Sequence, residues 1–163
     1  MRNEHAYRVA AWWTSGRTGL AKSDSAPNAI HFTAPTEFGG LEGRWTPEEL
    51  LLASIVSCFS VTVRAVATRS HFDFVDLKVE TRGTVRKADA GYRFSEIVVH
   101  PCLTIACQEN TEQGLNLLKL AENLCLVSRA LHTQLDFEHQ IVVVETAESA
   151  SSSNHCVSEG FSI

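Results

Sequence analysis

Five cysteines are the residues of this chain best suited to redox chemistry. Their odd number, their wide spacing and the lack of a secretion signal at the N-terminus favour free thiols in a reducing compartment, so we expect a cytoplasmic protein. A disulfide between two of them would then be catalytic rather than structural. The five are Cys58, Cys102, Cys107, Cys125 and Cys156.

Residue type alone does not make any of these thiols reactive. Cys58 lies within an apolar segment, and burial in apolar surroundings raises the pKa of a thiol and leaves little thiolate at neutral pH. Cys102 and Cys107 have a spacing that matches no common metal site, and the histidines show no ligand or nucleophile–base spacing. We therefore expect neither a metal nor a cofactor.

A helix that begins at Thr46 must position Cys58. The sequence Thr46-Pro47-Glu48-Glu49 combines an N-cap, a proline in the first turn and a glutamate three residues after the cap, which is typical of a capping box. Glu49 takes the capping role by this spacing, which leaves Glu48 without a structural task. Glu48 and Cys58 are ten residues apart, about 15 Å along a straight helix, so they could meet only between two antiparallel copies.

Residues 50–67 are apolar on every side of this helix, which is typical of a helix buried in a core or at a subunit interface. The segment is long enough to span a membrane, but polar residues interrupt it on several faces, so we interpret it as a core helix. These polar residues are Ser54, Ser57, Ser60, Thr62 and Arg64.

Strands flank the central helix rather than alternating with helices, which predicts an α+β fold. Sequence patterns predict strands over 5–13, 28–33, 76–86, 92–102 and 137–146, and helices over 109–123 and 127–133. We expect one domain over residues 1–146 and a flexible tail over residues 147–163. The net charge of −5 gives no basic surface for nucleic acid or an anionic membrane, so a small or neutral ligand fits better.

Two stretches of the sequence resemble one known family. The first covers residues 38–59 and includes Thr46-Pro47-Glu48 and Cys58; the second covers residues 121–130, which read AENLCLVSRA and include Cys125. They are similar to the osmotically inducible protein C and organic hydroperoxide resistance (OsmC/Ohr) family, and the similarity extends over roughly residues 5–146. In that family a (Thr/Asn)-Pro-Glu sequence starts the helix, and a catalytic cysteine follows ten residues after the glutamate.

The resemblance implies an OsmC-like fold, with antiparallel sheets around a long buried central helix, in an intertwined homodimer. It implies a peroxidase that reduces organic hydroperoxides in defence against oxidative stress. Cys58 is then the attacking thiolate and Cys125 the resolving cysteine, and a dithiol of the lipoyl type reduces their disulfide. By the same resemblance Arg17, in the first hairpin turn, stabilises the thiolate and is held by Glu48.

Apolar side chains expected around the thiols would favour a bulky organic hydroperoxide over hydrogen peroxide, with an ordinary core role as the alternative for each. Leu126 replaces a proline that one branch of the family has after the second cysteine, so the branch is left open. The alternative function is a redox-sensing or ligand-binding dimer with little peroxide turnover, and a third interpretation makes both cysteines spectators. The candidate substrate-pocket residues are Phe38, Trp45, Leu51, Ile55 and Phe59.

Overall fold

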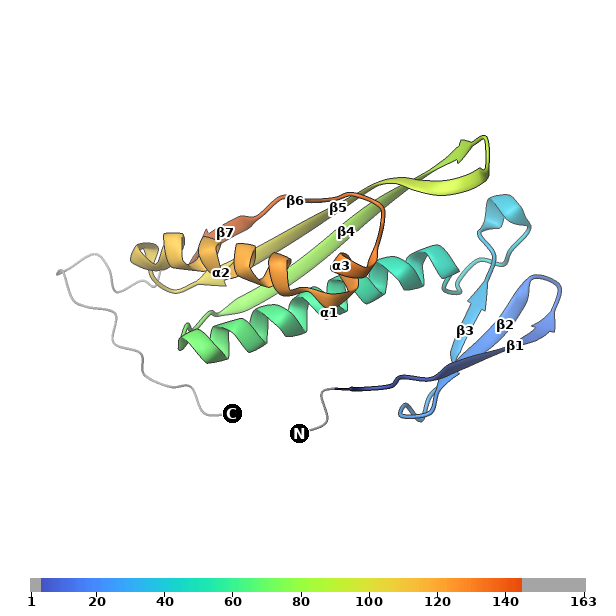
Figure 1. The fold of residues 1–163 in the computed structure, drawn as a ribbon, viewed down its shortest axis with the longest axis horizontal. Helices are drawn as coiled ribbons and strands as arrows, with labels where there is room; N and C mark the ends of the chain where they lie inside the picture. Colours follow the sequence, from blue (N-terminus) through green and yellow to red (C-terminus); the bar gives the residue numbers. More distant parts are fainter. Residues whose placement is uncertain (1–3, 145–163) are drawn as a thin grey trace. The chain divides into compact units, whose positions relative to one another are not determined.

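The computed structural model describes residues 4–144 of the chain (Figure 1). The predicted tail over residues 147–163 lies outside the described residues. The fold class is confirmed as α+β, with antiparallel sheets and a long central helix. The chain forms two compact units, Met1–Ala53 and Ser54–Ile163, and the helix α1 (Pro47–Ser70) begins in the first unit and continues into the second.

The first unit is a three-stranded antiparallel sheet in the order β1 (Val9–Ser15), β2 (Thr18–Ser23) and β3 (Ile30–Thr33). Gly16 has a φ of 52° and, with Arg17, forms the turn between β1 and β2 that the sequence predicts. After β3 the chain passes through the short helix η1 (Thr36–Phe38) to Gly40. A Cβ atom at Gly40 would lie 1.5 Å from the carbonyl oxygen of Ala34, so this loop requires glycine.

The helix α1 starts with the predicted capping box. The backbone N–H of Glu49 donates to Thr46 Oγ1 at 3.2 Å, and the backbone N–H of Thr46 donates to Glu49 Oε2 at 2.8 Å. These two bonds satisfy donors that the first turn of a helix cannot satisfy itself. They fix the start of α1 and therefore the positions of Glu48 and Cys58 along it.

The second unit contains a long antiparallel hairpin of β4 (Asp76–Ala88) and β5 (Gly91–Ile105), as predicted. The single strand predicted over residues 137–146 is instead two short strands, β6 (Leu135–Phe137) and β7 (Gln140–Val143), within the described part of that range. Both pair with β5 in parallel. Between them the backbone N–H of Glu138 donates to the carbonyl of Val99 at 2.9 Å, so the segment stays on the sheet without forming a continuous ladder.

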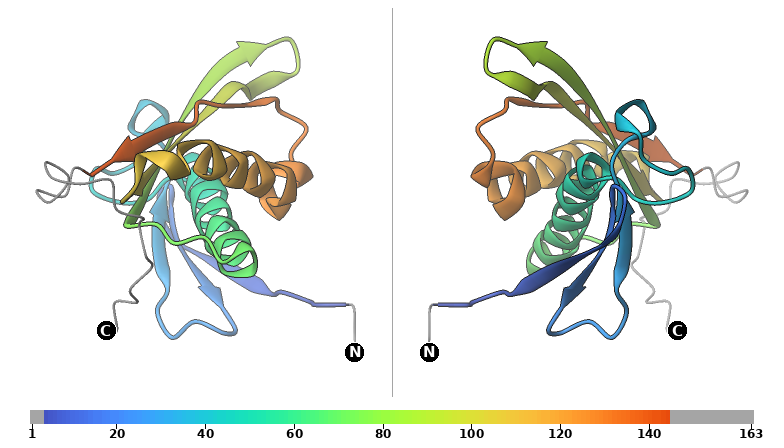
Figure 2. Two further views of the ribbon diagram at one scale, coloured as in Figure 1. Left: turned by 90° about the vertical axis from the view of Figure 1, so that its left-hand side faces the viewer. Right: turned by 90° about the vertical axis from the view of Figure 1, so that its right-hand side faces the viewer.

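Two further helices follow β5 and the short helix η2 (Gln108–Asn110): α2 (Thr111–Leu124) and α3 (Leu126–Ala130). Figures 1 and 2 show α1 and α2 on the same face of the second sheet. Apolar side chains from both helices and from β5 form the core between them. Its fully or nearly fully buried members include Phe59, Val63, Val66, Leu103, Ile105, Leu117, Leu118, Ala121 and Cys125.

The helix α1 is buried along one stripe rather than all round. Its buried residues recur every three to four positions: Ile55, Phe59, Val63, Val66 and Ala67. In contrast, Val61 is 67% exposed. Of the most apolar 18-residue stretch of the helix, only 28% is buried within this chain. By length and composition α1 is also the one described helix that could cross a membrane.

Candidate active site

The structure brings Cys58 and Cys125 together within the second unit. Cys58 lies on α1 beside the buried Phe59, and it packs against the core cluster that contains Cys125. Both are free thiols, and a hydrogen bond joins their sulfur atoms. Two cysteines that are distant in the sequence are therefore neighbours in the fold.

Cys125 occupies the junction of two helices. It is the C-cap of α2 and the N-cap of α3, and its extended backbone (φ −63°, ψ 111°) separates the two helices. Its side chain is fully buried, and the Ser128 hydroxyl donates a hydrogen bond of 3.1 Å to its sulfur. The first backbone N–H groups of α3 have no partner within that helix, so they are free to donate to the thiol pair.

The environment of Cys58 favours its thiolate. Burial by itself raises the pKa of Cys58, but the backbone N–H of Val127, the Cys125 thiol, the backbone N–H of Leu126 and the Thr62 hydroxyl all bond to the sulfur and lower its pKa. The hydrogen bonds outweigh burial, and the pKa of Cys58 lies below its ordinary value. Neutral donors, two of them backbone N–H groups of α3, therefore lower the pKa of Cys58 without a cation.

The environment of Cys125 favours its protonated thiol. Burial raises the pKa of Cys125, the side chain and backbone N–H of Ser128 oppose that rise, and the neighbouring Cys58 raises the pKa further. Between the two thiols, Cys125 is therefore the one that holds its proton more strongly. The two thiols of the pair therefore differ in acidity, with Cys58 the more readily ionised.

The predicted Arg17 and Glu48 lie in the first unit. The guanidine arm of Arg17 lies over Gly39: a Cβ atom there would be 3.9 Å from Arg17 Cδ and Nε. The Arg17 carbonyl accepts the backbone N–H of Ala34 at 3.0 Å. Among residues 4–144 no hydrogen bond or ion pair joins Arg17 to Glu48, so their pairing stays a prediction.

Glu48 has an unsatisfied oxygen. Its Oε2 atom is buried and has no hydrogen-bond partner in the described chain. A carboxylate oxygen removed from water without a donor costs free energy, about 1–3 kcal/mol or more for a charged group. Glu48 therefore has an unmet hydrogen-bonding requirement within the described residues.

The candidate substrate-pocket residues divide between the two units. Ile55 and Phe59 are fully buried side chains, and Phe59 packs against Phe137 with ring centroids 5.4 Å apart. Phe38, Trp45 and Leu51 lie in the first unit, and Trp45 is 51% exposed. Their role in substrate binding stays a prediction.

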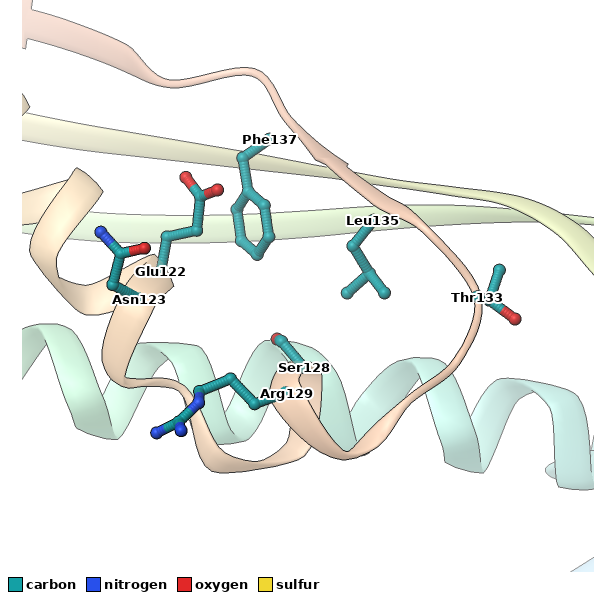
Figure 3. Close-up of a pocket in the computed structure, with 7 residues that line it drawn as sticks. All are labelled: Glu122, Asn123, Ser128, Arg129, Thr133, Leu135 and Phe137. Carbon is teal, nitrogen blue, oxygen red and sulfur yellow. The ribbon is translucent and has the colours of Figure 1, made fainter.

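A shallow pocket of about 300 Å³ lies in the second unit, where the end of α2, α3 and β6 meet (Figure 3). This pocket is not predicted from the sequence. Ser128 reaches it from α3, and Leu135 and Phe137 face it from β6. Its lining consists of Glu122, Asn123, Ser128, Arg129, Thr133, Leu135 and Phe137.

Three features of the site were missed at the sequence level. They are the Thr62 hydroxyl, the backbone N–H groups of Leu126 and Val127, and the Ser128 hydroxyl. Thr62 is one helical turn after Cys58, so helical spacing could have suggested it. The backbone donors carry no sequence signal, because every residue except proline has one.

Among the other cysteines, Cys107 is disulfide-bonded, so the expectation of free thiols is wrong for this residue. Cys102 is a free thiol on β5, opposite Lys78 of β4. Cys156 lies outside the described residues. Within residues 4–144 no three histidine, cysteine or carboxylate side chains are grouped so that they could hold a metal ion.

The fold and the site define a two-thiol α+β protein. Residues 40–140 match the family model for OsmC-like proteins. The uncharacterised protein YmaD of Bacillus subtilis is 25% identical over 138 residues, which are 83% of this chain and 92% of that protein.

Two solved structures share the fold. An organic hydroperoxide resistance protein OsmC of Legionella pneumophila has a TM-score of 0.68 at 22% identity, over 85% of this chain and 98% of its own. An organic hydroperoxide resistance protein of Elizabethkingia anophelis has a TM-score of 0.69 at 20% identity, over 88% of this chain and all of its own. The chain belongs to the OsmC-like family, and the predicted resemblance is confirmed.

Proposed function

We propose that this protein is a thiol-dependent peroxidase that reduces organic hydroperoxides to alcohols. The observation that carries the proposal is the asymmetric thiol pair, in which Cys58 has a lowered pKa and Cys125 a raised one. Peroxide reduction requires an activated thiolate with a second thiol beside it. The two structural relatives named as organic hydroperoxide resistance proteins support the same chemistry.

The proposed reaction proceeds in three balanced steps. The Cys58 thiolate attacks the terminal peroxide oxygen, the O–O bond breaks, and the alkoxide takes a proton to leave as the alcohol. Cys58 is now a sulfenic acid, and the Cys125 sulfur attacks the Cys58 sulfur, forming the disulfide and releasing water. An external dithiol, for which we propose a lipoyl type, then supplies two electrons and two protons to restore both thiols. We propose that this cycle operates in the cytoplasm.

Hydrogen-bond donors around the sulfur support the first step. The N–H groups of Leu126 and Val127 stabilise negative charge on Cys58 through hydrogen bonds and transfer no proton to it. Cys125 waits as a neutral thiol and does not compete for peroxide. The order of oxidation is therefore built into the pair.

We further propose that the protein acts as a homodimer with α1 at the interface. Val61 and Ala65 lie among polar residues on the exposed side of α1, and Val61, 67% exposed, would stay in contact with water in a single chain. A second copy would cover it, and it would bring a donor toward the orphaned Glu48 Oε2. Polar residues within α1, among them Arg64, favour a protein partner over lipid.

Light scattering at micromolar concentration tests the assembly. We expect a dimer for the wild type and a monomer for Val61→Glu, because a charge in an apolar interface carries a large desolvation cost. Val85→Glu on β4, where Val85 is 39% exposed, is the control and should remain dimeric. A monomeric wild type would contradict the dimer and the proposed partner for Glu48.

A turnover assay tests the function itself. Purified protein is mixed with dihydrolipoamide and either cumene hydroperoxide or hydrogen peroxide, and peroxide loss is followed over many turnovers. We expect continuous consumption, faster with the apolar peroxide, because apolar side chains surround the thiols. A single stoichiometric oxidation without turnover would instead favour a redox sensor, and no oxidation of either cysteine would reject thiol chemistry altogether.

A further inference from the structure

Ser128 contacts the second thiol rather than the first. Its hydroxyl donates to the Cys125 sulfur at 3.1 Å, and its backbone N–H bonds to the same sulfur. The same side chain lines the pocket between α2, α3 and β6 (Figure 3). Ser128 therefore lies between the buried Cys125 and a surface open to water.

The resolving step makes a specific demand on Cys125. A thiol attacks a sulfenic acid as its thiolate, so Cys125 must give up its proton while fully buried. Before peroxide arrives, the negative Cys58 opposes that loss. After oxidation Cys58 is a neutral sulfenic acid, and its opposition ends. The burial of Cys125 then still disfavours its thiolate. Hydrogen-bond donors to the Cys125 sulfur determine how readily that thiolate forms.

We propose that Ser128 is the positioning residue of the resolving step, holding the Cys125 sulfur toward Cys58 and stabilising the negative charge that develops on it. The inference rests on the proposed function and extends it to a residue outside the thiol pair. The proton leaves Cys125 for water in the pocket. The new sulfur–sulfur bond displaces hydroxide from Cys58, which takes up a proton to become water, so the step is balanced with no further reactant.

The two donors of Ser128 predict a partial rather than a complete effect. Removing the hydroxyl leaves the backbone N–H in place. The loss of one hydrogen bond to a developing charge corresponds to roughly tenfold in rate. The oxidation of Cys58 depends on a different set of donors, those of α3's first residues and Thr62, and should change far less.

Rapid-mixing kinetics with cumene hydroperoxide separate the oxidation of Cys58 from the formation of the disulfide. A dimedone-type probe detects the Cys58 sulfenic acid, and a gel shift detects the disulfide. In Ser128→Ala we expect disulfide formation to slow about tenfold, its pH midpoint to move upward, and more Cys58 to reach the sulfinic acid. Ser128→Thr keeps the hydroxyl and should restore both the rate and the pH midpoint.

Ser60→Ala is the matched control. Its hydroxyl donates to the carbonyl of Val56 at 2.7 Å on α1 and to no sulfur, so both steps should proceed as in the wild type. If Ser128→Ala formed the disulfide at the wild-type rate and with the wild-type pH midpoint, the inference would be overturned. If the wild type formed no sulfenic acid, the proposed function would fail instead, and the two failures are therefore distinguishable.

Discussion

The two compact units of this chain differ in how much of their apolar surface is buried and in whether their functional groups find partners within the same unit. The second unit, Ser54–Ile163, has a contiguous core and contains both thiols with the donors that set their pKa values. The first unit, Met1–Ala53, has few buried side chains, and Trp13 on β1 is 74% exposed. The first also contains Arg17 and the unsatisfied Glu48.

This difference indicates that the second unit alone sets the pKa values of the two thiols. Within the thiol pair, the pKa of Cys58 is lowered and that of Cys125 is raised. No charge from the first unit is involved, because backbone and hydroxyl donors lower the pKa of Cys58. The first unit has exposed aromatic side chains and an unsatisfied carboxylate oxygen on Glu48. We therefore expect changes in the second unit to affect chemistry most strongly, and changes in the first to tune it.

The largest effect should come from Cys58→Ser. A serine hydroxyl is nearly the same size but far less nucleophilic, so peroxide consumption should fall to background while the fold is kept. Circular dichroism and the turnover assay measure these together. Cys102→Ser removes another free thiol of the same unit and should retain wild-type turnover. Near-normal activity in Cys58→Ser would show that another thiol is the nucleophile.

Cys125→Ser should abolish turnover but not the first oxidation. Without a second thiol to trap the sulfenic acid, Cys58 should advance to sulfinic and sulfonic acid under excess peroxide. Intact-mass spectrometry after stepwise peroxide addition follows these products. A stable disulfide between Cys58 and Cys102 or Cys107 in the oxidised wild type would identify a different resolving cysteine.

Arg17→Ala tests what the first unit adds. If Arg17 lies beside the thiolate in the assembled protein, its removal should raise the pKa of Cys58 and slow peroxide reduction about tenfold. Arg17→Lys should recover only part of the rate, because the planar guanidinium fork is lost.

The pH dependence of iodoacetamide alkylation at Cys58 measures the effect of Arg17 directly. Arg64→Ala is the matched control, since Arg64 lies over the Phe74 ring at 5.6 Å and not among the groups that lower the pKa of Cys58. An unchanged alkylation profile in Arg17→Ala would mean that the donors of the second unit suffice.

Thr62→Val should have a smaller effect on the same thiolate. The Thr62 hydroxyl is among the groups that lower the pKa of Cys58, and it lies 2.8 Å from the Cys58 carbonyl, so its single hydrogen is shared between the sulfur and that carbonyl. Its loss should raise the pKa and slow oxidation about two- to tenfold. Thr68→Val, which removes an equivalent bond to the Arg64 carbonyl at 2.9 Å, should leave the alkylation profile unchanged. Equal effects of both would indicate a general change in the helix.

His139→Gln should have the smallest effect, and on stability alone. Burial lowers the pKa of His139 below 6.5, Glu122 opposes this and Lys119 adds to it. As the pH falls through 6.5, the unfolded chain binds the proton first, so His139 makes the fold less stable in acid. At pH 5 the variant should gain about 2–4 °C in Tm relative to the wild type, with little difference at pH 8. An equal shift at both pH values would exclude titration as the cause.

Local patterns in the sequence determined much of this fold. The capping box at Thr46, the long apolar helix and the hairpin of β4 and β5 depend on residues close together in the chain, and they were predicted. The split of the last strand into β6 and β7 was not, because it depends on where β5 offers parallel partners. Strand pairing over long separations has no periodic signature.

The residue types show which side chains are suited to redox chemistry, and the family resemblance indicates Cys58 and Cys125 among them. How the two thiols differ depends on the tertiary structure. The chain path between α2 and α3 aims the N–H groups of Leu126 and Val127 at one sulfur and the Ser128 hydroxyl at the other. A thiol's pKa depends on the donors and the burial within a few ångströms of it, and these come from segments that folding alone brings together.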